Sequence, residues 1–472
     1  MDQSSESWDV VIIGAGAAGL AAAEEVSKAG CKTLVLEARG RTGGRIYTVH
    51  DSNSPTPLEL GAEFIHGMPE SLLKIAHRGL LTYYDLADEH AYAVPRSESS
   101  ELVPMPHFWE DLALVMKKAR LLAERDRSFA EFLMGAERDP ELRRFLPFVR
   151  GYVEGFHAAD PRALSLKALS GTESEMDEAN GRRISRFLGG YDQVIQWLEK
   201  GAKRNGAEIR LNTVVYEINW SHNSVELQVR SRAGMQLKKI HARKVIVTIP
   251  LSLLHASVHE SRMEGAIRFN PPLREKRDAV DHLKMGPVMK VLLRFRSRFW
   301  EKAHSNAHIV HQNLAELAFI HHAPDPDVAF PTWWTQKPIR APLLTAWAGG
   351  PQALELGDHT EEGLVEEAIR ALALISGFPR SMIEEELDGW AFHDWQSDPY
   401  ARGAYSFVAV NGVTAQRELA EPMQDTLFIA GEATHFNGQS GTVDGAIDTG
   451  VLAGQRVVQA LLSSGPTESL SA

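Results

Sequence analysis

Cysteine is almost absent from this chain of 472 residues, which contains only Cys31. An intramolecular disulfide is therefore impossible, and the sequence is compatible with a reducing compartment. Basic residues are also in deficit, because 50 lysines and arginines stand against 62 aspartates and glutamates, a formal net charge of −12. This balance disfavours a nucleic-acid partner and mildly favours cationic small molecules through long-range attraction.

Long apolar runs are missing as well. The longest uncharged apolar stretch, Val10 to Ala23, is shorter than the roughly 20 residues that a membrane-spanning helix needs. The residues before it include Asp2, Glu6 and Asp9 but no lysine or arginine, which argues against a signal peptide. We therefore expect a cytoplasmic protein without a membrane span.

Several catalytic motifs are absent too. The chain contains no P-loop, no H-E-x-x-H metalloprotease helix and no G-x-S-x-G nucleophile elbow. His304, His321 and His322 are scattered without the spacing of a metal site, so the sequence predicts no metal.

What is present is an N-terminal segment with the element order of a nucleotide-binding βαβ unit. Trp8–Ile13 is a short β-branched run typical of a buried parallel strand. Leu20–Lys28 is an alanine-rich helical stretch that stops at Gly30, and a second strand is predicted at Thr33–Leu36.

The turn between the first strand and the helix carries the pattern G-x-G-x-x-G. Gly14 allows the tight turn, Gly16 lets backbone approach a pyrophosphate, and Gly19 lets helix and strand pack closely. Ala18 lies in the same turn, where free N–H groups of the helix N-terminus face the phosphates. Glu37 follows the second strand and is placed to accept hydrogen bonds from ribose hydroxyls.

The loop after Glu37 favours FAD over NAD as the dinucleotide. It contains Ala38, Arg39, Gly44 and Arg45, with further arginine and glycine between them. FAD needs more cationic and backbone donors, because its pyrophosphate joins two large groups that lie extended through the protein. The run from Glu37 to Arg45 resembles the second motif of the flavin amine oxidase superfamily.

Four later stretches resemble the same family, and with the N-terminal unit they extend from Val10 to Val457. They are Glu59–Gly67, Leu283–Val291, Trp395–Phe407 and Leu427–Ala446. Together they imply an α/β fold of two domains: a Rossmann-like FAD-binding domain of the glutathione-reductase type, with an inserted substrate domain made of a mixed sheet and helices.

Hydrophobic periodicity suggests how these domains are distributed. The βαβ unit, a meander of short strands between residues 209 and 249, and a C-terminal strand–loop–helix indicate one discontinuous nucleotide domain. The early part of the second domain has mainly helical patterns, with a capping box at Ser128 and Glu131. An amphipathic helix is predicted at Thr360–Ile375, stopped by Gly377. We assign the FAD-binding domain to residues 8–70, 189–265 and 415–462, the substrate domain to 71–188 and 266–414, and flexible tails to 1–7 and 463–472.

The first later stretch implies contacts with the flavin ring. In the family this strand runs beneath the isoalloxazine, which assigns Gly61, Ala62, Glu63 and Phe64 to the cofactor. Phe64 stands where the polyamine-oxidising branch commonly has tryptophan. His66 matches a histidine at the substrate entrance and is a candidate substrate contact; a structural histidine near a turn is the alternative.

Lys290 is the central residue of the second stretch. By strand alternation it shares a face with Val288 and Leu292, so its ammonium lies among apolar neighbours and needs a partner. The matching lysine of the family holds a water against flavin N5, and its proposed roles are oxygen activation and proton relay. The alternative is a lysine that reaches solvent at a strand edge.

The third and fourth stretches imply the substrate face. Trp395 is expected to pack against the flavin ring and Tyr405 to form one aromatic wall of the amine cage. Ala404 stands where monoamine oxidases carry the cysteine that bonds to flavin, so FAD should be non-covalent. Thr442 replaces the tyrosine of the second wall, as in animal-type polyamine oxidases, which favours a longer, aliphatic amine.

The closing motif contributes further cofactor contacts. Gly431 and Glu432 match residues near the ribityl and pyrophosphate end. A helix that starts near Gly445 is expected to aim its N-terminus at the pyrimidine edge of the flavin. The predicted cofactor set is completed by Gly441, Thr442, Val443 and Val215.

The resemblance implies an FAD-dependent amine oxidase. A primary or secondary amine, with a polyamine-like one favoured, is expected to transfer hydride to flavin N5. Oxygen then reoxidises the flavin, which gives H2O2, an imine and finally an aldehyde. Lys290, Tyr405, His66 and Thr442 are the candidate catalytic residues. The expected partners are the amine and O2, and the expected assembly is a monomer or homodimer.

Two alternatives remain open. An L-amino-acid oxidase uses the same flavin machinery but needs an arginine for the substrate carboxylate, for which Arg186 and Arg402 are the candidates. A desaturase, or a protein that holds flavin only structurally, also fits the fold. A substrate panel with peroxide detection separates these possibilities.

Overall fold

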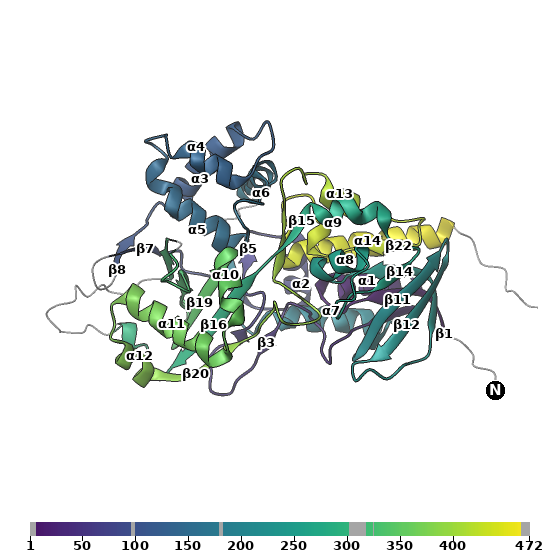
Figure 1. Cartoon of the computed structure of the whole chain (residues 1–472). Coiled ribbons are helices and arrows are strands. Elements are labelled where there is room, and N and C mark those ends of the chain that lie inside the picture. Colours follow the sequence, from purple (N-terminus) through teal and green to yellow (C-terminus); the bar gives the residue numbers. More distant parts are fainter. Residues whose placement is uncertain (1–5, 96–99, 179–182, 302–317, 324, 464–472) are drawn as a thin grey trace, which may run out of the picture.

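Two mixed β-sheets, one of eight strands and one of seven, form the framework of the chain. The structure is a computed structural model and describes residues 6–95, 100–178, 183–301, 318–323 and 325–463. Helices cover both sheets, and Figure 1 shows the sheets on opposite sides of the molecule's centre. The predicted two-part α/β architecture is confirmed.

The parallel part of the eight-stranded sheet is built around β1 (Glu6–Ile13). On either side lie β2 (Thr33–Leu36) and β13 (Ile240–Val247), both parallel to β1. β10 (Glu208–Arg210) extends the sheet beyond β2, and β22 (Leu427–Ile429) pairs with β13. The second half of β1 and all of β2 are buried, as strands covered on both faces must be. The predicted βαβ unit is therefore present.

The same sheet continues as an antiparallel meander. β11 (Thr213–Ser221) pairs with β12 (Ser224–Ser231), which pairs in turn with β13. This is the predicted meander, except that β10 lies at the opposite edge, beside β2. β14 (Arg268–Asn270) runs parallel to β11, so a strand of this sheet comes from the segment that the sequence assigned to the substrate domain.

One face of this sheet is covered by α1 (Ala17–Lys28), α7 (Asp192–Arg204) and α14 (Val443–Ser463), which share a core with β1 and β2. α14 lies directly on α1. A Cβ at Gly450 of α14 would come within 2.2 Å of the Ala18 carbonyl oxygen. Small residues on both helices therefore permit this close approach.

The seven-stranded sheet has the order β20-β16-β19-β18-β17-β7-β8. Its strands are β7 (His90–Pro95), β8 (Ser100–Pro104), β16 (Val288–Phe295), β17 (Phe319–His322), β18 (Thr332–Trp334), β19 (Leu343–Gly349) and β20 (Leu387–Phe392). β7 and β8 come from the block for which the sequence predicts mainly helix, and that part of the prediction is wrong. Both strands are short and mix polar with small residues, so their hydrophobic pattern is weak.

A separate group of helices lies beside this sheet: α3 (Phe108–Leu121), α4 (Phe129–Ala136), α5 (Leu146–Phe156) and α6 (Leu166–Glu178). Figure 1 shows them together at the upper left. The predicted capping box starts α4, because the Ser128 hydroxyl accepts from the Glu131 N–H and the Glu131 carboxylate accepts from the Ser128 N–H.

The other side of the seven-stranded sheet packs against α11 (Glu361–Ser376). The Thr360 hydroxyl accepts from the Gly363 N–H at 3.2 Å, and Gly377 ends the helix with φ of 72°. Both end signals were present in the sequence, and the predicted helix is confirmed.

The shorter elements connect these layers. They are β3 (Thr48–Val49), β4 (Leu58–Glu59), β5 (Ile65–His66), α2 (Glu70–Gly79), β6 (Tyr83–Asp85), β9 (Ile184–Phe187), α8 (Leu251–Val258), α9 (Arg277–Asp281), β15 (Leu283–Gly286), α10 (Pro351–Glu355), α12 (Arg380–Glu386), β21 (Tyr405–Val408) and α13 (Ala415–Ala420). In the part of the chain that the structure describes, no helix combines the length and apolarity needed to cross a membrane.

Candidate functional site

One cavity of about 400 Å³ runs from the G-x-G-x-x-G turn to the inner face of the seven-stranded sheet. Of the residues predicted from sequence to contact cofactor or substrate, all line this cavity except Gly19. They are Gly14, Gly16, Ala18, Glu37, Ala38, Arg39, Gly44, Arg45, Gly61, Ala62, Glu63, Phe64, His66, Val215, Lys290, Trp395, Tyr405, Gly431, Glu432, Gly441, Thr442 and Val443. Segments far apart in the sequence therefore meet at one site.

The fingerprint turn has the geometry that its glycines allow. Gly14 has φ of 103°, a conformation that residues with a side chain rarely adopt. A Cβ at Gly19 would lie 1.9 Å from the Gly14 carbonyl oxygen, so Gly19 serves the contact between helix and turn. Gly16 is the N-cap of α1, and the helix therefore starts at the cavity wall.

Glu37 is a buried carboxylate at the end of β2, only 4% exposed. Oε2 accepts from the Ala15 N–H and Oε1 from the Arg39 N–H, both at 2.8 Å. The Glu37 side chain thus connects the G-x-G-x-x-G turn, here called the fingerprint turn, to the loop from Ala38 to Arg45, here called the arginine loop. Because a carboxylate oxygen has two lone pairs, Glu37 keeps capacity for the ribose contact predicted from sequence.

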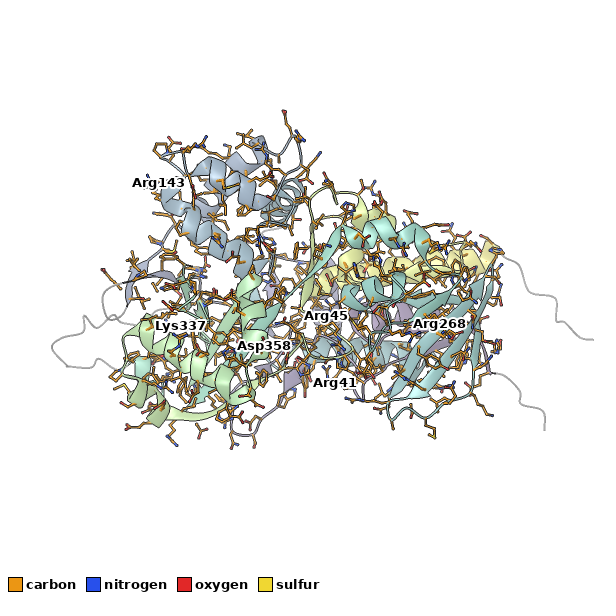
Figure 2. All side chains as sticks on the ribbon, viewed as in Figure 1. Arg41, Arg45, Arg143, Arg268, Lys337 and Asp358 are labelled. Carbon is orange, nitrogen blue, oxygen red and sulfur yellow. The ribbon has the colours of Figure 1, made fainter. Side chains whose placement is uncertain are left out.

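Arg45 connects the arginine loop to the last cofactor motif. Its Nη1 donates to Glu432 Oε1 at 2.8 Å and to the Ala404 carbonyl oxygen at 2.7 Å. The second carboxylate oxygen of Glu432 accepts from the Ser406 hydroxyl at 2.5 Å. Both oxygens of Glu432 are therefore engaged by the protein itself. Figure 2 shows Arg45 at the centre of the molecule, between the two sheets.

Arg39 makes a second link across the cavity. Its Nη2 lies 2.7 Å from Asp398 Oδ1, and His393 Nε2 lies 2.9 Å from the other carboxylate oxygen. Burial raises the pKa of Asp398, but the hydrogen bonds from His393 and Arg39 outweigh it and hold the pKa well below its ordinary value. Asp398 is thus ionised at neutral pH and holds Arg39 at the cavity wall.

Gly61 packs between Arg45 and Trp395. A Cβ at this position would lie 1.9 Å from the Arg45 carbonyl oxygen and 3.2 Å from the Trp395 ring. Trp395 donates from Nε1 to the Leu60 carbonyl oxygen at 2.8 Å and is 4% exposed. The segment that begins at Gly61 and continues through Ala62 therefore forms a backbone surface along the cavity.

The glycines of the lining leave room for a group that approaches the backbone. A Cβ at Gly431 meets no atom within 4 Å, and a Cβ at Gly16 meets only the Gly43 carbonyl oxygen at 4.0 Å. Val215, 6% exposed, adds an apolar side chain to the lining. These residues fit an extended flavin dinucleotide held by backbone and by the two cavity-lining arginines.

Thr442 and Asp444 shape the start of α14. The Thr442 hydroxyl donates to the Gln439 carbonyl oxygen at 2.7 Å and accepts from the Gly445 N–H at 3.1 Å. This hydroxyl caps the helix, so its first task is structural. Burial raises the pKa of Asp444 to about 7. Val443 is the first residue of α14 and lies on the cavity wall, close to where the sequence predicts the helix start.

Lys290 has the partner that its burial demands. Its Nζ lies 2.6 Å from Glu63 Oε2 and donates to the Gly61 carbonyl oxygen at 3.2 Å. The lysine side chain is 3% exposed and the glutamate side chain 4%. The alternative of a lysine that reaches solvent is therefore excluded.

The seven-stranded sheet presents a row of side chains to the cavity. Lys290 pairs with Trp347, Trp347 with Thr332, Thr332 with His321, and His321 with Tyr92. All five residues line the cavity. Because neighbouring strands lie about 4.8 Å apart, the row from Lys290 to Tyr92 spans roughly 19 Å. The chamber beyond Lys290 is therefore long.

His66 and Tyr405 stand near the same chamber. The Tyr405 hydroxyl donates to the Phe156 carbonyl oxygen at 2.8 Å, which fixes its ring. The His66 ring meets the rings of Phe64 and Phe156 edge to face. Burial lowers the pKa of His66 to about 4, so the ring is neutral at pH 7. Its Nδ1 is buried and has no hydrogen-bond partner among the described residues.

Sequence reasoning missed several members of the chamber. Trp347, Thr332 and Tyr92 carried no motif, and only their cross-strand pairing brings them together. His321 and His322 line the cavity although their spacing indicated no site, whereas His304 lies outside the described residues. The side chains of Trp333 and Trp334 lie on opposite faces of β18: Trp334 lines the cavity, and Trp333 is buried in the core behind the sheet.

His321 ends a short hydrogen-bonded chain that leads to the surface. His321 Nε2 lies 2.9 Å from His90 Nδ1, and His90 Nε2 lies 2.9 Å from Asp88 Oδ1. Burial lowers the pKa of His321 well below its ordinary value. Neither Arg186 nor Arg402 is among the described residues of the cavity lining, so the two arginines considered for a substrate carboxylate point elsewhere.

The fold and the cavity define a flavin-dinucleotide oxidoreductase. The chain matches the family model of flavin containing amine oxidoreductases over residues 17–458. It belongs to that family and is an amine oxidoreductase with a flavin cofactor, and the dinucleotide fingerprint identifies the flavin as FAD.

Named relatives agree with the family match. Polyamine oxidase 3 of Oryza sativa is 29% identical over 96% of this chain and 90% of its own length. Lysine-specific histone demethylase 1B of Mus musculus is 28% identical over 94% of this chain, which spans only 52% of that relative.

Solved structures share the fold. A putrescine oxidase in complex with putrescine has a TM-score of 0.75 and 20% identity, with 96% of this chain and 99% of the other covered. Cyclohexylamine oxidase from Brevibacterium oxydans has a TM-score of 0.74 and 21% identity at the same coverage.

Proposed function

We propose that this chain is an FAD-dependent oxidase of long primary or secondary amines, with non-covalent FAD and with O2 as the final electron acceptor. The observation that carries the proposal is the single cavity that joins the G-x-G-x-x-G turn to a long chamber beside Lys290. FAD held between the G-x-G-x-x-G turn and Glu432 would supply a hydride acceptor for the amine's α-carbon, and with O2 as the oxidant the products would be H2O2 and an imine. The imine released from the chain hydrolyses to an aldehyde.

The chain's own residues position the amine and exclude water. Tyr405, fixed through the Phe156 carbonyl oxygen, gives one aromatic wall of the chamber. Aromatic rings line much of the rest and exclude water from the chamber. Since His66 is neutral at pH 7, its ring adds no positive charge that would repel a cationic amine.

The preference for a polyamine-like substrate is supported by three features. Relatives and structural neighbours are named polyamine and putrescine oxidases. The row from Lys290 to Tyr92, roughly 19 Å long, gives an extended aliphatic amine a wall to lie along. Thr442 in place of a second aromatic wall removes the compact cage that an arylalkylamine needs.

Non-covalent attachment of FAD is supported by the position of the single thiol. Cys31 lies before β2 and is not part of the described cavity lining. Ala404 occupies the place of the flavin-linked cysteine of monoamine oxidases, and its carbonyl oxygen accepts from Arg45. We further propose that the protein works in the cytoplasm as a monomer or homodimer, with residues 8–70, 189–265 and 415–462 holding FAD.

The amino-acid oxidase alternative is disfavoured by the arginines. Arg39 and Arg45 are the arginines of the described lining, and each is bonded to a carboxylate, Asp398 or Glu432, at the cofactor end. Arg186 is 5% exposed and bonded to Glu63, so it is not free to bind a substrate carboxylate.

The test is a purification followed by anaerobic titration of the flavin spectrum. The protein should be yellow, should release FAD on denaturation, and should bleach with spermine, spermidine or putrescine, faster than with a phenylalkylamine or amino acids. Peroxide should appear when air is admitted. Bleaching by amino acids alone would favour the alternative, and a flavin that no amine bleaches would overturn the proposal.

A further inference from the structure

The carboxylate of Glu63 is bound by two cations in the interior of the protein. Lys290 Nζ lies 2.6 Å from Oε2, and Arg186 Nη2 lies 2.6 Å from Oε1. The Trp334 indole also donates to Oε1, at 3.0 Å. None of the three charged side chains is more than 5% exposed. Glu63 is therefore the common partner of two buried positive charges.

The electrostatics of this group depend on Glu63. Two cations and one anion leave a net charge of +1, whereas loss of the anion would leave two cations side by side in an interior with a low dielectric constant. Burial raises the pKa of Glu63, but Arg186 and Lys290 outweigh it and hold the pKa below its ordinary value. The carboxylate is thus ionised at neutral pH.

The group of Glu63, Arg186 and Lys290 also connects three separate elements of the fold. Glu63 lies between β4 and β5, on the same backbone surface as Gly61, whose carbonyl oxygen accepts from Lys290 at 3.2 Å. Arg186 comes from β9 and Lys290 from β16. Arg186 is held in turn, because it donates to the Thr335 carbonyl oxygen at 3.3 Å and lies 4.9 Å over the Phe64 ring. The position of the Lys290 ammonium is therefore fixed by Glu63 and by the Gly61 carbonyl oxygen.

We propose that Glu63 is a positioning residue for Lys290: it holds the Lys290 ammonium against the Gly61 carbonyl oxygen, while Arg186 holds Glu63 in place. This assignment rests on the proposed function, in which Lys290 acts beside the flavin. The flavin contact predicted from sequence for Glu63 then falls to its backbone, because both carboxylate oxygens face protein cations.

The first test is kinetic and uses the holoenzyme. Glu63→Gln and Lys290→Met should each keep FAD but slow the same half-reaction, reduction by amine or reoxidation by O2, roughly tenfold or more in stopped-flow experiments. The double variant should be no slower than Lys290→Met alone, because residues that act as a unit are not additive. Glu63→Asp, which keeps the anion on a shorter side chain, should recover part of the rate that Glu63→Gln loses.

Glu154→Gln is the control. Glu154 is also a buried acid, 5% exposed, but its partner is Arg150 at 2.9 Å rather than Lys290. Its effect on the half-reaction rates should multiply with that of Lys290→Met. If Glu63→Gln fails to fold, the double variant Glu63→Gln/Arg186→Met takes its place in the kinetic series. That double variant keeps one buried cation, Lys290, and so has the same net charge at this group as the wild type.

Thermal unfolding provides a readout that does not need turnover. A double-mutant cycle of Glu63→Gln and Lys290→Met should show strong coupling in the melting temperature, with the double variant more stable than Glu63→Gln. Additive melting shifts, or half-reaction rates in Glu63→Gln that equal those of the wild type, would overturn the assignment. If no amine reduces the wild-type flavin, the proposed function fails, while the unfolding cycle still decides whether Glu63 holds Lys290.

Discussion

Arg45 and Glu432 lie 387 residues apart in the sequence and 2.8 Å apart in the structure. The pair joins the arginine loop after β2 to the segment after β22, and Glu432 is 5% exposed. A buried ion pair of this kind holds two segments in register only while both members are present, because a lone buried charge is costly.

Loss of the Arg45 side chain should therefore lower the FAD content of the purified protein to near zero. Arg45→Met leaves Glu432 without its cation, at a cost of about 3–5 kcal/mol, and removes one of the two arginines on the described cavity wall. We expect purified Arg45→Met to have little flavin absorbance and a lower melting temperature. Arg268→Gln is the control, since Arg268 is 71% exposed and Figure 2 places it away from the centre. Equal flavin content in both variants would contradict this expectation.

The contact at Gly19 should tolerate no side chain. A methyl group there would sit 1.9 Å from the Gly14 carbonyl oxygen, so Gly19→Ala should destabilise the chain by about 1–3 kcal/mol or more and displace the fingerprint turn. The measurements are urea denaturation and FAD content. Gly135→Ala in α4 is the matched control, because a Cβ there meets no atom within 4 Å and alanine favours helix by about 1 kcal/mol. A Gly19→Ala protein as stable as wild type would show that the turn can shift.

The stability of the chain should depend on pH through His66. Its pKa is lowered from the ordinary 6.5 to about 4 in the folded state. The unfolded chain therefore takes up the proton first as pH falls, so stability is lost between pH 6.5 and about 4. The full linkage of about 3 kcal/mol is an upper bound, because the ring borders the cavity.

His66→Gln should remove that part of the acid destabilisation. The drop in melting temperature between about pH 7.5 and pH 5 should be smaller in the variant than in the wild type. His50→Gln serves as the control, since the His50 side chain is 56% exposed and paired with Asp192. A pH dependence that is the same in all three proteins would rule out a buried neutral His66.

Removal of the Tyr405 hydroxyl should loosen one wall of the chamber without unfolding the protein. Tyr405→Phe loses the hydrogen bond to the Phe156 carbonyl oxygen, worth about 1 kcal/mol. We expect unchanged FAD content and a severalfold lower rate of flavin reduction by amine. Burial holds the pKa of Tyr405 well above its ordinary value, so the hydroxyl is neutral and the pH profile should not move. A new ionisation in the profile of the variant would instead assign Tyr405 a role in proton transfer.

The cofactor half of the site could be predicted because local chemistry dictates it. The glycines of the fingerprint, Glu37 and the caps of α11 act through backbone geometry that is encoded within a few residues. The sequence showed that Lys290 requires a charged partner, but it could not show that this partner is Glu63. Burial and alternation show that a charge must be paired, whereas only the tertiary structure shows which distant acid pairs with it.

The chamber half could not be predicted, because cross-strand neighbours create it. Trp347, Thr332 and Tyr92 have no mutual spacing in the sequence, and β7 itself was hidden by a weak pattern within a helical block. The role of Thr442 as a helix cap was likewise concealed, since a hydroxyl at that position fits a substrate contact equally well.

The placement of β22 next to β13 has a consequence for how the protein is made. On a ribosome the fingerprint turn, the arginine loop and the whole seven-stranded sheet emerge before Glu432 does. A nascent chain therefore has no carboxylate for Arg45 until its final tenth is translated, and tight retention of FAD has to be a late event in synthesis. Chains stalled before residue 427 should emerge colourless and sensitive to protease.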